Sequence, residues 1–199
     1  MKILIASKNR GKLREIKSIS KGKFEIISPL DLPLNISILE DGFSLKENAL
    51  KKALTYHRET GFCTLGEDTA LEVEILKGRP GIHSARFSGG DDRENRKKLL
   101  EELNKTSNRS ARFRTVMALV LQDNWVEYFE GFLEGKISLF EKGDGGFGYD
   151  PIFIPLRYNK TLAEISEEEK NRISHRCKAL NKLIDFLQNK IELLEDICK

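Results

Sequence analysis

Two long strand-like runs separated by only two residues constrain the fold of this chain more than any other feature of its sequence. The runs cover residues 112–122 and 125–132, and Asp123-Asn124 joins them. Strands connected by so short a polar turn pair with each other as an antiparallel hairpin. Residues 135–140 are predicted to form a further strand soon after the hairpin. An antiparallel part of a sheet is therefore expected near the middle of the chain.

The beginning of the chain predicts a different unit, in which a buried strand leads directly into a helix. Residues 2–6 are a short apolar run, and residues 12–20 place Leu13, Ile16 and Ile19 on one side of a helix. A strand followed at once by a helix is typical of α/β folds.

Capping residues and apolar stripes mark the other helices. A capping box of the form S-x-x-E begins the predicted helix over residues 44–60, and a second one begins a helix at residue 166. A charged helix is predicted over residues 91–104, and an apolar stripe marks the last helix, after residue 174. With no repeat and no linker, the 199 residues are expected to form one α/β domain.

Composition limits the kinds of partner that the chain can have. Lys and Arg (34) exceed Asp and Glu (31) by only three, so no strongly basic surface for nucleic acid is expected. No apolar run approaches the roughly 18 residues of a membrane span. The three cysteines, Cys63, Cys177 and Cys198, lack the spacing of a metal site and are expected to be reduced thiols in a cytoplasmic protein.

The turn between the first strand and the first helix is a candidate anion site. Its sequence is Ser7-Lys8-Asn9-Arg10-Gly11-Lys12. Free N–H groups and the positive end of the helix dipole attract anions there, and a lysine adds a full charge. The spacing of a P-loop is absent. The alternative is a surface turn with solvated lysines.

Two charged residues near the second predicted helix each have two interpretations. Lys52 shares its side of the helix with less polar residues, so it either extends past them to water or points at an anion. Glu40 precedes the helix and is either a solvated acid near the helix N-terminus or a metal ligand.

The adjacent acids Glu67 and Asp68 lie at a predicted break between two strand-like runs. After them Leu71, Val73 and Ile75 alternate with glutamates, which is the period of a half-buried strand. Carboxylates at such a break can hold Mg²⁺ or act as a general base. Acids of a hairpin turn are the ordinary alternative.

The stretch GGFGYDPIF at residues 145–153 combines three glycines, three aromatic rings and a carboxylate. Glycines let the backbone approach a ligand closely, and rings offer stacking surfaces to a nucleobase. The alternative is a tight turn that enters a strand, with Phe147 and Phe153 in the core. Near the end of the chain, Lys170, His175 and Arg176 bring several donors suited to carbonyl or phosphate oxygens, although a lone histidine is more often structural.

In this order, these segments resemble one family, the inosine/xanthosine triphosphate pyrophosphatases, which remove deaminated purine nucleotides. The resemblance runs from residue 3 to about residue 187, nearly the whole chain. The matching motifs are Ser7-x-Asn9-x-x-Lys12, Glu40-x-Gly42, Glu47-Asn48-Ala49-x-x-Lys52-Ala53, Glu67-Asp68-Thr69, Pro80-Gly81-x-x-Ser84-Ala85-Arg86-Phe87, Gly145 to Phe153, and Glu169-Lys170-Asn171-x-Ile173-Ser174-His175-Arg176.

The resemblance implies an elongated mixed α/β fold with a twisted sheet, flanking helices and two lobes, with the active site in the cleft between them. It also implies a homodimer. The implied reaction is Mg²⁺-dependent hydrolysis of a nucleoside triphosphate to the monophosphate and pyrophosphate, with a preference for ITP, dITP and XTP. One or more Mg²⁺ ions per subunit are implied.

Residue roles follow from the same resemblance. Asp68 resembles the general base and, with Glu40, a ligand of Mg²⁺. The implied phosphate contacts are Ser7, Lys8, Asn9, Arg10, Gly11, Lys12, Lys52 and Lys170. The implied nucleoside pocket consists of Thr69, Phe147, Gly148, Tyr149, Asp150, His175 and Arg176. Inosine and xanthosine carry an O6 acceptor where adenosine carries an amino group, so donors at His175 and Arg176 would reject adenine.

One departure from the family pattern and two competing functions stay open. Many bacterial members carry Asp-Asp-Ser-Gly where this chain has Glu67-Asp68-Thr69-Ala70, so the second acid alone is kept. A related pyrophosphatase acting on dTTP or modified pyrimidine triphosphates is the enzymatic alternative. A nucleotide-binding or RNA-binding module without turnover is the other alternative, and only the net positive charge favours it.

Overall fold

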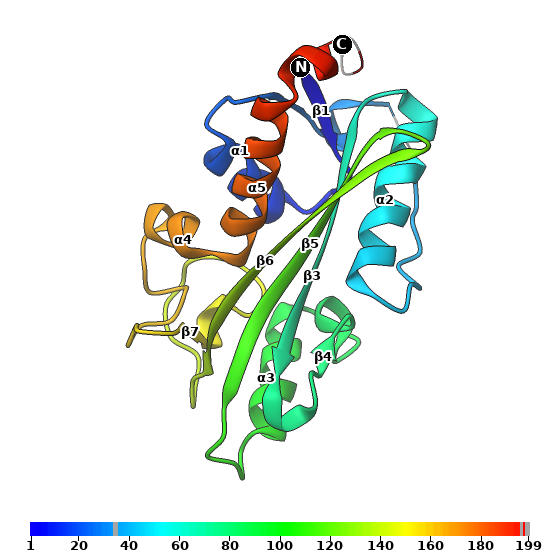
Figure 1. Ribbon diagram of the computed structural model, residues 1–199. Coiled ribbons are helices and arrows are strands. Elements are labelled where there is room, and N and C mark those ends of the chain that lie inside the picture. The colour runs from blue at the N-terminus through cyan, green and yellow to red at the C-terminus, as the bar shows by residue number, and fades with distance from the viewer. Residues whose placement is uncertain (34–35, 196, 198–199) are drawn as a thin grey trace. The chain divides into compact units, whose positions relative to one another are not determined.

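A computed structural model describes residues 1–33, 36–195 and 197 of the chain. Its strands form one mixed sheet with the order β2-β1-β3-β5-β6-β7, and β4 pairs with β3 (Figure 1). The strands are β1 (Lys2–Ile5), β2 (Glu25–Ile27), β3 (Thr64–Val73), β4 (Pro80–Gly81), β5 (Ser110–Gln122), β6 (Trp125–Ile137) and β7 (Phe153–Pro155). β1 is parallel to both β2 and β3, whereas β3–β4 and β6–β7 are antiparallel. The predicted mixed α/β fold with flanking helices is confirmed.

The helices begin close to their predicted capping residues. They are α1 (Arg10–Ser20), α2 (Leu45–Thr60), α3 (Asp92–Glu102), α4 (Glu167–Ile173), α5 (His175–Asn189) and α6 (Ile191–Glu195). The side chains of Ser44 and Ser166 accept hydrogen bonds from the third residues of α2 and α4, as the S-x-x-E pattern predicts. None of the helices in the described residues is long and apolar enough to cross a bilayer.

The chain divides into two compact units, and each is described by itself. Unit 1 consists of Met1–Asp68, Thr115–Gly131 and Arg176–Lys199, and unit 2 of Thr69–Arg114 and Phe132–His175. The long strands β3, β5 and β6 contribute residues to both units.

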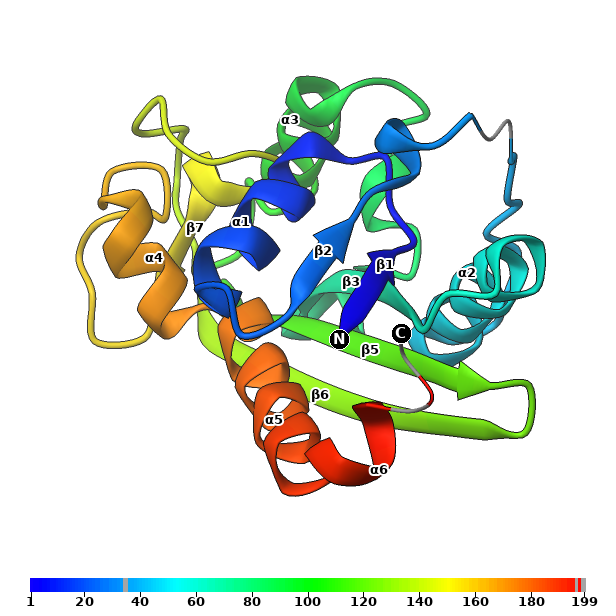
Figure 2. The ribbon, with the colours of Figure 1, turned by 90° about the horizontal axis from the view of Figure 1, so that it is seen from above.

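Unit 1 is built around β1, whose two faces are both buried. Ile3 and Ile5 belong to a core cluster that also contains apolar residues of α1 and α5, and Leu4 and Ala6 pack in a second cluster with Tyr56 of α2. Because side chains alternate along a strand, helices are needed on both faces. Figure 2 shows α1 and α2 on opposite sides of β1.

The contact between α2 and β3 in unit 1 depends on a glycine. A Cβ on Gly66 would lie 2.0 Å from the carbonyl oxygen of Ala49 and 2.8 Å from the backbone nitrogen of Ala53. Real Cβ atoms do not approach backbone atoms so closely, so only glycine allows the strand to lie this near the helix. The two residues that follow Gly66 are the adjacent acids Glu67 and Asp68.

Unit 2 has its own core. Leu71 and Val73 of β3, Leu99 of α3, and Phe113 of β5 pack there with Phe153. The ring of Phe113 lies 4.6 Å from that of Phe153, so aromatic packing links β5 to the start of β7.

Several expectations from the sequence are wrong in detail. The chain does not break at Glu67-Asp68, because β3 is continuous from Thr64 to Val73 and both acids are buried within it. Ile75 lies in a 3-10 turn rather than in the strand. No separate strand covers residues 135–140, since β6 itself continues to Ile137. Cys63 is disulfide-bonded, so the expectation of three reduced thiols is wrong there, whereas Cys177 is a buried thiol that forms no disulfide.

Candidate active site

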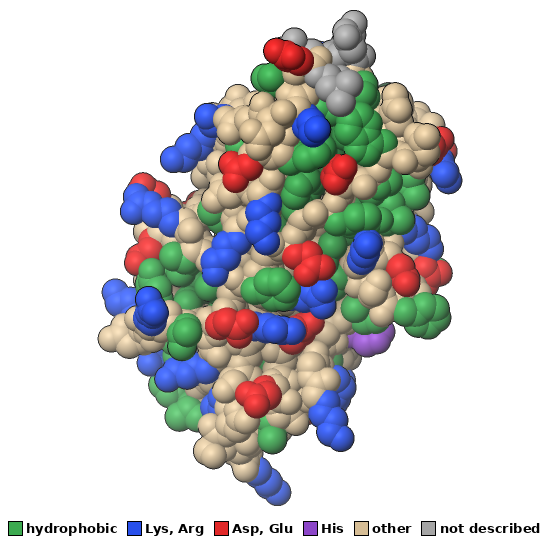
Figure 3. Space-filling view, in the orientation of Figure 1, with side chains coloured by type: hydrophobic (Ala, Val, Ile, Leu, Met, Phe, Trp, Pro, Cys, Tyr) green, Lys and Arg blue, Asp and Glu red, His purple; other side chains and the backbone are tan. Residues whose placement is uncertain are grey.

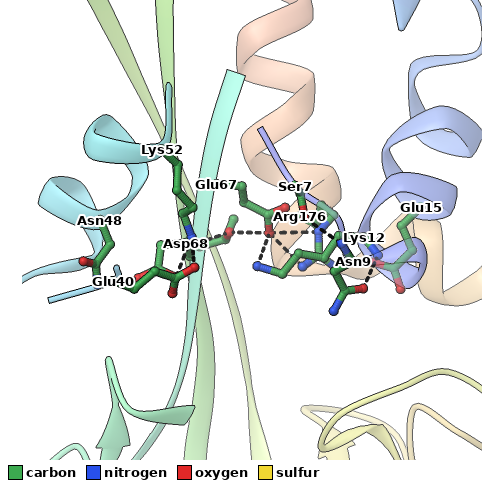
Figure 4. Close-up of polar contacts among 11 residues, drawn as sticks. Ser7, Asn9, Lys12, Glu15, Glu40, Asn48, Lys52, Glu67, Asp68 and Arg176 are labelled. Carbon is green, nitrogen blue, oxygen red and sulfur yellow. Dashed lines mark hydrogen bonds and ion pairs between the residues drawn. The ribbon is translucent and has the colours of Figure 1, made fainter. Parts of the chain in front are cut away.

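Asp68 lies in a group of polar side chains in unit 1, next to Lys52, Glu40 and Asn48 (Figure 4). It is 6% exposed, and both of its carboxylate oxygens are hydrogen-bonded: Lys52 Nζ donates to Oδ1 at 3.2 Å and Asn48 Nδ2 donates to Oδ2 at 3.1 Å. Lys52 and Asn48 lie one turn apart on the side of α2 that faces β3, so helix and strand together fix the orientation of the carboxylate.

Lys52 also joins Asp68 to Glu40. Its ammonium lies 3.1 Å from Glu40 Oε1, and the Lys52 side chain is only 9% exposed. Lys52 therefore does not extend past its neighbours to water, which was one of the two interpretations of its position. A single cation stands between two carboxylates from different segments, and this arrangement is compatible with a site for a divalent cation.

The turn before α1 is organised by its own polar side chains. Asn9 is the N-cap of α1, and its side chain accepts a hydrogen bond from the backbone nitrogen of Lys12 at 3.0 Å. Ser7 Oγ accepts from the backbone nitrogen of Asn9, and Lys8 Nζ donates to the carbonyl of Ile36. The turn that is a candidate anion site therefore leads into a well-formed helix N-terminus, and anion binding there stays a prediction.

Lys12 faces inward from that helix start. Its ammonium lies 3.9 Å from Glu67 Oε1, and its side chain is 17% exposed. Burial lowers the pKa of Lys12, and the charges of Lys52 and Arg176 act in the same direction, whereas Glu67 opposes them. A buried cation of this kind gains from the arrival of an anion.

A buried ion cluster adjoins Lys12 and consists of Glu67, Arg176 and Glu15. Arg176 donates from Nε and Nη2 to Glu67 Oε1, at 2.9 and 2.7 Å, and from Nη1 to Glu15. Thr115 Oγ1 donates to the same oxygen of Glu67 at 3.0 Å. Burial opposes the charge of Arg176, but the carboxylates of Glu67 and Glu15 outweigh it and raise its pKa.

This cluster includes residues that sequence analysis did not assign to the site. Glu15 and Thr115 were missed, and Asn48 was noted only as part of a motif. The spacing of Lys12 and Glu15, three residues apart in a helix, was the available signal, because it places both on one face. The contacts found for the Arg176 guanidinium are with carboxylates, so its role in reading the base stays a prediction.

The glycine-rich stretch is part of unit 2, where Asp150 holds it together. Asp150 Oδ2 accepts from the backbone nitrogen of Phe147 at 2.8 Å and from Lys170 Nζ, and Asp150 itself is 3% exposed. The Lys170 ammonium also lies 4.7 Å from the centre of the Phe147 ring. The predicted phosphate contact Lys170 is therefore close to the predicted stacking residue.

Two other predicted pocket residues of unit 2 are buried. Tyr149 is 6% exposed and its hydroxyl donates to the carbonyl of Ser84 at 2.7 Å. His175 is 3% exposed and stacks on Phe113, with ring centres 4.7 Å apart. Thr69 is half-buried in β3. Among the described residues no group of three or more His, Cys, Asp or Glu side chains is arranged to hold a metal ion.

Comparison with known proteins identifies the family. The model of the Ham1 family matches residues 3–186 of the chain. The chain belongs to the Ham1 family. A relative named dITP/XTP pyrophosphatase from Porphyromonas gingivalis is 44% identical over 189 residues, which cover 94% of this chain and 97% of that protein. A relative of the same name from Clostridium tetani is 40% identical over 196 residues, covering 96% and 98%.

Solved structures of Ham1 proteins share the fold. The Ham1 protein of Staphylococcus aureus has a TM-score of 0.85 and 36% identity, covering 96% of this chain and all of that one. The HAM1 protein of Coxiella burnetii has a TM-score of 0.86 and 35% identity, covering 95% and 99%. The family that the sequence motifs resembled is confirmed, and with it the mixed α/β architecture.

Proposed function

We propose that this chain hydrolyses ITP, dITP and XTP to the nucleoside monophosphate and pyrophosphate. The observation that carries the proposal is the buried carboxylate of Asp68, held at both oxygens by Lys52 and Asn48 in a Ham1-family chain. A carboxylate fixed in this way is oriented to accept a proton from a water molecule. Relatives at 40–44% identity named dITP/XTP pyrophosphatase support the choice of substrate.

The residues present fit a divalent cation. Glu40 and Asp68 already share one cation, the Lys52 ammonium, and their ligand atoms are the carboxylate oxygens that Mg²⁺ prefers. Mg²⁺ is commonly held by one or two protein carboxylates together with phosphate oxygens and water, so a pair of acids suffices. A bound Mg²⁺ would neutralise phosphate charge and lower the pKa of a nearby water. Activity should be lost in EDTA and restored by Mg²⁺.

The chain's own residues supply the other requirements. A triphosphate carries about four negative charges, so it needs several cations close together. In unit 1, Lys12, Lys52 and the N-terminus of α1 provide positive charge for the phosphates. Asp68 takes the proton of the water that attacks the α-phosphorus, and pyrophosphate leaves. Hydrolysis in ¹⁸O-water should label the monophosphate, and label in the pyrophosphate would contradict attack at that atom.

The residues proposed to read the base are those that the family resemblance implies. Phe147 offers a ring for stacking, and the donors of His175 and Arg176 suit an O6 acceptor. The proposal also includes the homodimer that the family resemblance implies. It further includes a cytoplasmic location, where nucleotide triphosphates are made. Light scattering with size-exclusion chromatography would test the dimer, because a monomer mass of 22.8 kDa would exclude it.

The deciding experiment measures pyrophosphate release from ITP, XTP, dITP, GTP, ATP and dTTP. Wild type should prefer the first three, and Asp68→Asn should lose at least about a hundredfold in kcat, as expected for removal of a general base. Asp123→Asn is the matched control, since that acid is 65% exposed in the β5–β6 turn of the same unit.

Other outcomes point to the alternatives. Activity centred on dTTP would assign the chain to the pyrimidine triphosphate pyrophosphatases. No turnover of any triphosphate would leave a binding module. Figure 3 shows Lys and Arg interspersed with Asp and Glu over the face drawn, so the basic stripe of an RNA-binding surface is not seen on that face.

A further inference from the structure

Helix α3 holds both polar backbone groups of Gly148 in unit 2. Asp92 Oδ2 accepts a hydrogen bond from the Gly148 nitrogen at 3.0 Å. Arg96 Nη1 donates to the Gly148 carbonyl at 2.8 Å. Asp92 and Arg96 are four residues apart in α3, so they lie on the same side of the helix. We call these two side chains the Gly148 clamp.

The helix that carries the clamp is itself firmly placed. Its N-cap is Asp91, which forms a capping box with Glu94, and Leu99 is fully buried in the core of unit 2. Asn95, between the two clamp residues, is 1% exposed, accepts from the backbone nitrogen of Ser88 and donates to the carbonyl of Ala85. Because the helix is rigid, the clamp fixes the position of the glycine loop relative to the core of unit 2.

Arg96 is also fixed from a second direction. Its Nε lies 3.1 Å from Glu141 Oε2, and its side chain is 13% exposed. The Glu141 contact is an ion pair without hydrogen-bond geometry, and the Nη1 bond to the Gly148 carbonyl is the directional contact, so the two together limit the rotamers of Arg96. The Arg96 side chain is therefore more than a surface charge that happens to lie near the loop.

The loop needs an external support at Gly148. This residue has φ of +60°, in the left-handed region, and as a glycine it can leave that conformation at little steric cost. Its neighbours are anchored independently: Asp150 accepts from Phe147 nitrogen, and Tyr149 donates to Ser84 carbonyl. Burial, reinforced by the nearby Asp92 carboxylate, raises the pKa of Tyr149, so its hydroxyl remains a donor.

We propose that Asp92 and Arg96 are positioning residues for nucleobase recognition, an inference that rests on the proposed function of the Phe147 loop. Neither residue needs to touch the substrate. Gly148 directly follows Phe147 in the chain. By fixing the backbone of Gly148, the two side chains also fix the ring of Phe147, on which the base stacks in the proposed function. A displacement of about 1 Å in a positioned group can cost up to a hundredfold in rate. Loss of the clamp therefore weakens discrimination between bases, because the base edge is no longer held in one position relative to the hydrogen-bond donors that read it.

Three variants test the clamp and one serves as a control. Asp92→Ala removes the acceptor, Asp92→Asn removes the charge but keeps an acceptor oxygen, and Arg96→Gln removes the donor fork. Lys97→Gln is the control, because Lys97 is 75% exposed on the same helix and its contact with Glu101 is 4.0 Å long. The quantity measured is the ratio of kcat/KM for ITP to kcat/KM for ATP. Since both rates come from one preparation, a partly unfolded variant does not alter the ratio.

The ratio should fall at least about fivefold in Asp92→Ala and in Arg96→Gln, chiefly through a higher KM for ITP. It should stay within about twofold of the wild-type ratio in Asp92→Asn and in the control Lys97→Gln. Hydrogen exchange at the Gly148 amide should be faster in Asp92→Ala. Faster exchange with an unchanged ratio would mean that the clamp only stabilises the loop and would overturn the proposal. An equal loss in Lys97→Gln would also overturn it.

The experiment separates this proposal from the function on which it rests. A wild type that hydrolyses ITP no faster than ATP would refute the proposed substrate preference. The clamp would then be judged by the ratio between the best and the worst base in the panel. Variants that keep that ratio would refute the clamp, whatever the preferred base is.

Discussion

Replacing Arg176 by methionine should destabilise unit 1 strongly, although methionine is of similar length and suits a buried site. The wild-type side chain is 2% exposed and contacts Glu67, which is fully buried, and Glu15, which is 5% exposed. With Lys12 nearby, the group holds two cations and two anions. Arg176→Met leaves two carboxylates with one cation.

The magnitude follows from the burial of these charges. Breaking a buried ion pair by removing one partner costs about 3–5 kcal/mol, because the remaining charge stays desolvated. For a chain of this size each kcal/mol lowers Tm by roughly 2–4 °C, so a fall of about 6–20 °C is expected. The matched control is Arg58→Met. Its ion pair with Asp123 in the same unit is 63% and 65% exposed, and an exposed pair is worth only about 0–1 kcal/mol.

Urea unfolding followed by tryptophan fluorescence is a suitable assay. Trp125, the single tryptophan, packs against the core of unit 1 and so reports on that unit. The double variant Arg176→Met/Glu15→Gln leaves only Lys12 facing Glu67, one charge of each sign. The free energy of unfolding that the double variant loses should be smaller than the sum of the losses in the two single variants by at least about 1 kcal/mol. Additive losses, or an Arg176→Met loss no larger than that of Arg58→Met, would refute the argument from buried charge.

Three further changes test other contacts. Gly66→Ala should cost at least about 2 kcal/mol in urea unfolding, because its Cβ meets the Ala49 carbonyl at 2.0 Å; a neutral result would show that α2 can shift freely. Burial lowers the pKa of Lys12, so between that pKa and about 10.4 the unfolded chain binds more protons than the folded chain. The free energy of unfolding of wild type, relative to that of Lys12→Met, should therefore rise with pH in that window. A difference that stays constant with pH would contradict the shift. Asp150→Ala leaves the buried Lys170 without that carboxylate and should raise KM for ITP at least about tenfold in steady-state kinetics, whereas an unchanged KM would remove the Asp150–Lys170 pair from binding.

Local sequence signals were sufficient for most of the secondary structure. The start of α2 was predictable because its S-x-x-E capping box acts within four residues, and the β5–β6 hairpin because a two-residue turn leaves one way of pairing. Asp68 was singled out because two adjacent acids lie between two strand-like runs, where carboxylates can hold a metal ion or act as a general base. Each of these signals depends on near neighbours in the chain.

The parts that were missed depend on residues far apart in the sequence. The pair Glu67-Asp68 was taken for a break because charged residues disfavour a buried strand, yet Arg176, more than 100 residues away, compensates Glu67 within β3. The spacing of Glu15 from Lys12 placed the two on one helix face but gave no indication that Glu15 would be buried against Arg176. The clamp residues Asp92 and Arg96 looked like ordinary charges on a polar helix until Gly148 was found against them.

The contact at Gly66 also determines where the chain can change in length. Because α2 touches β3 through backbone atoms, the helix is in fixed register with the strand, and this register keeps Lys52 opposite Asp68. Each residue of an α-helix turns the next by about 100°, so a deletion between Ala49 and Lys52 would rotate Lys52 away from its partner. A deletion before Glu40 would leave that register and the Glu40–Lys52 contact intact. The stretch from Ala49 to Ala53 is therefore the part of the helix whose length cannot change if the site is to be kept.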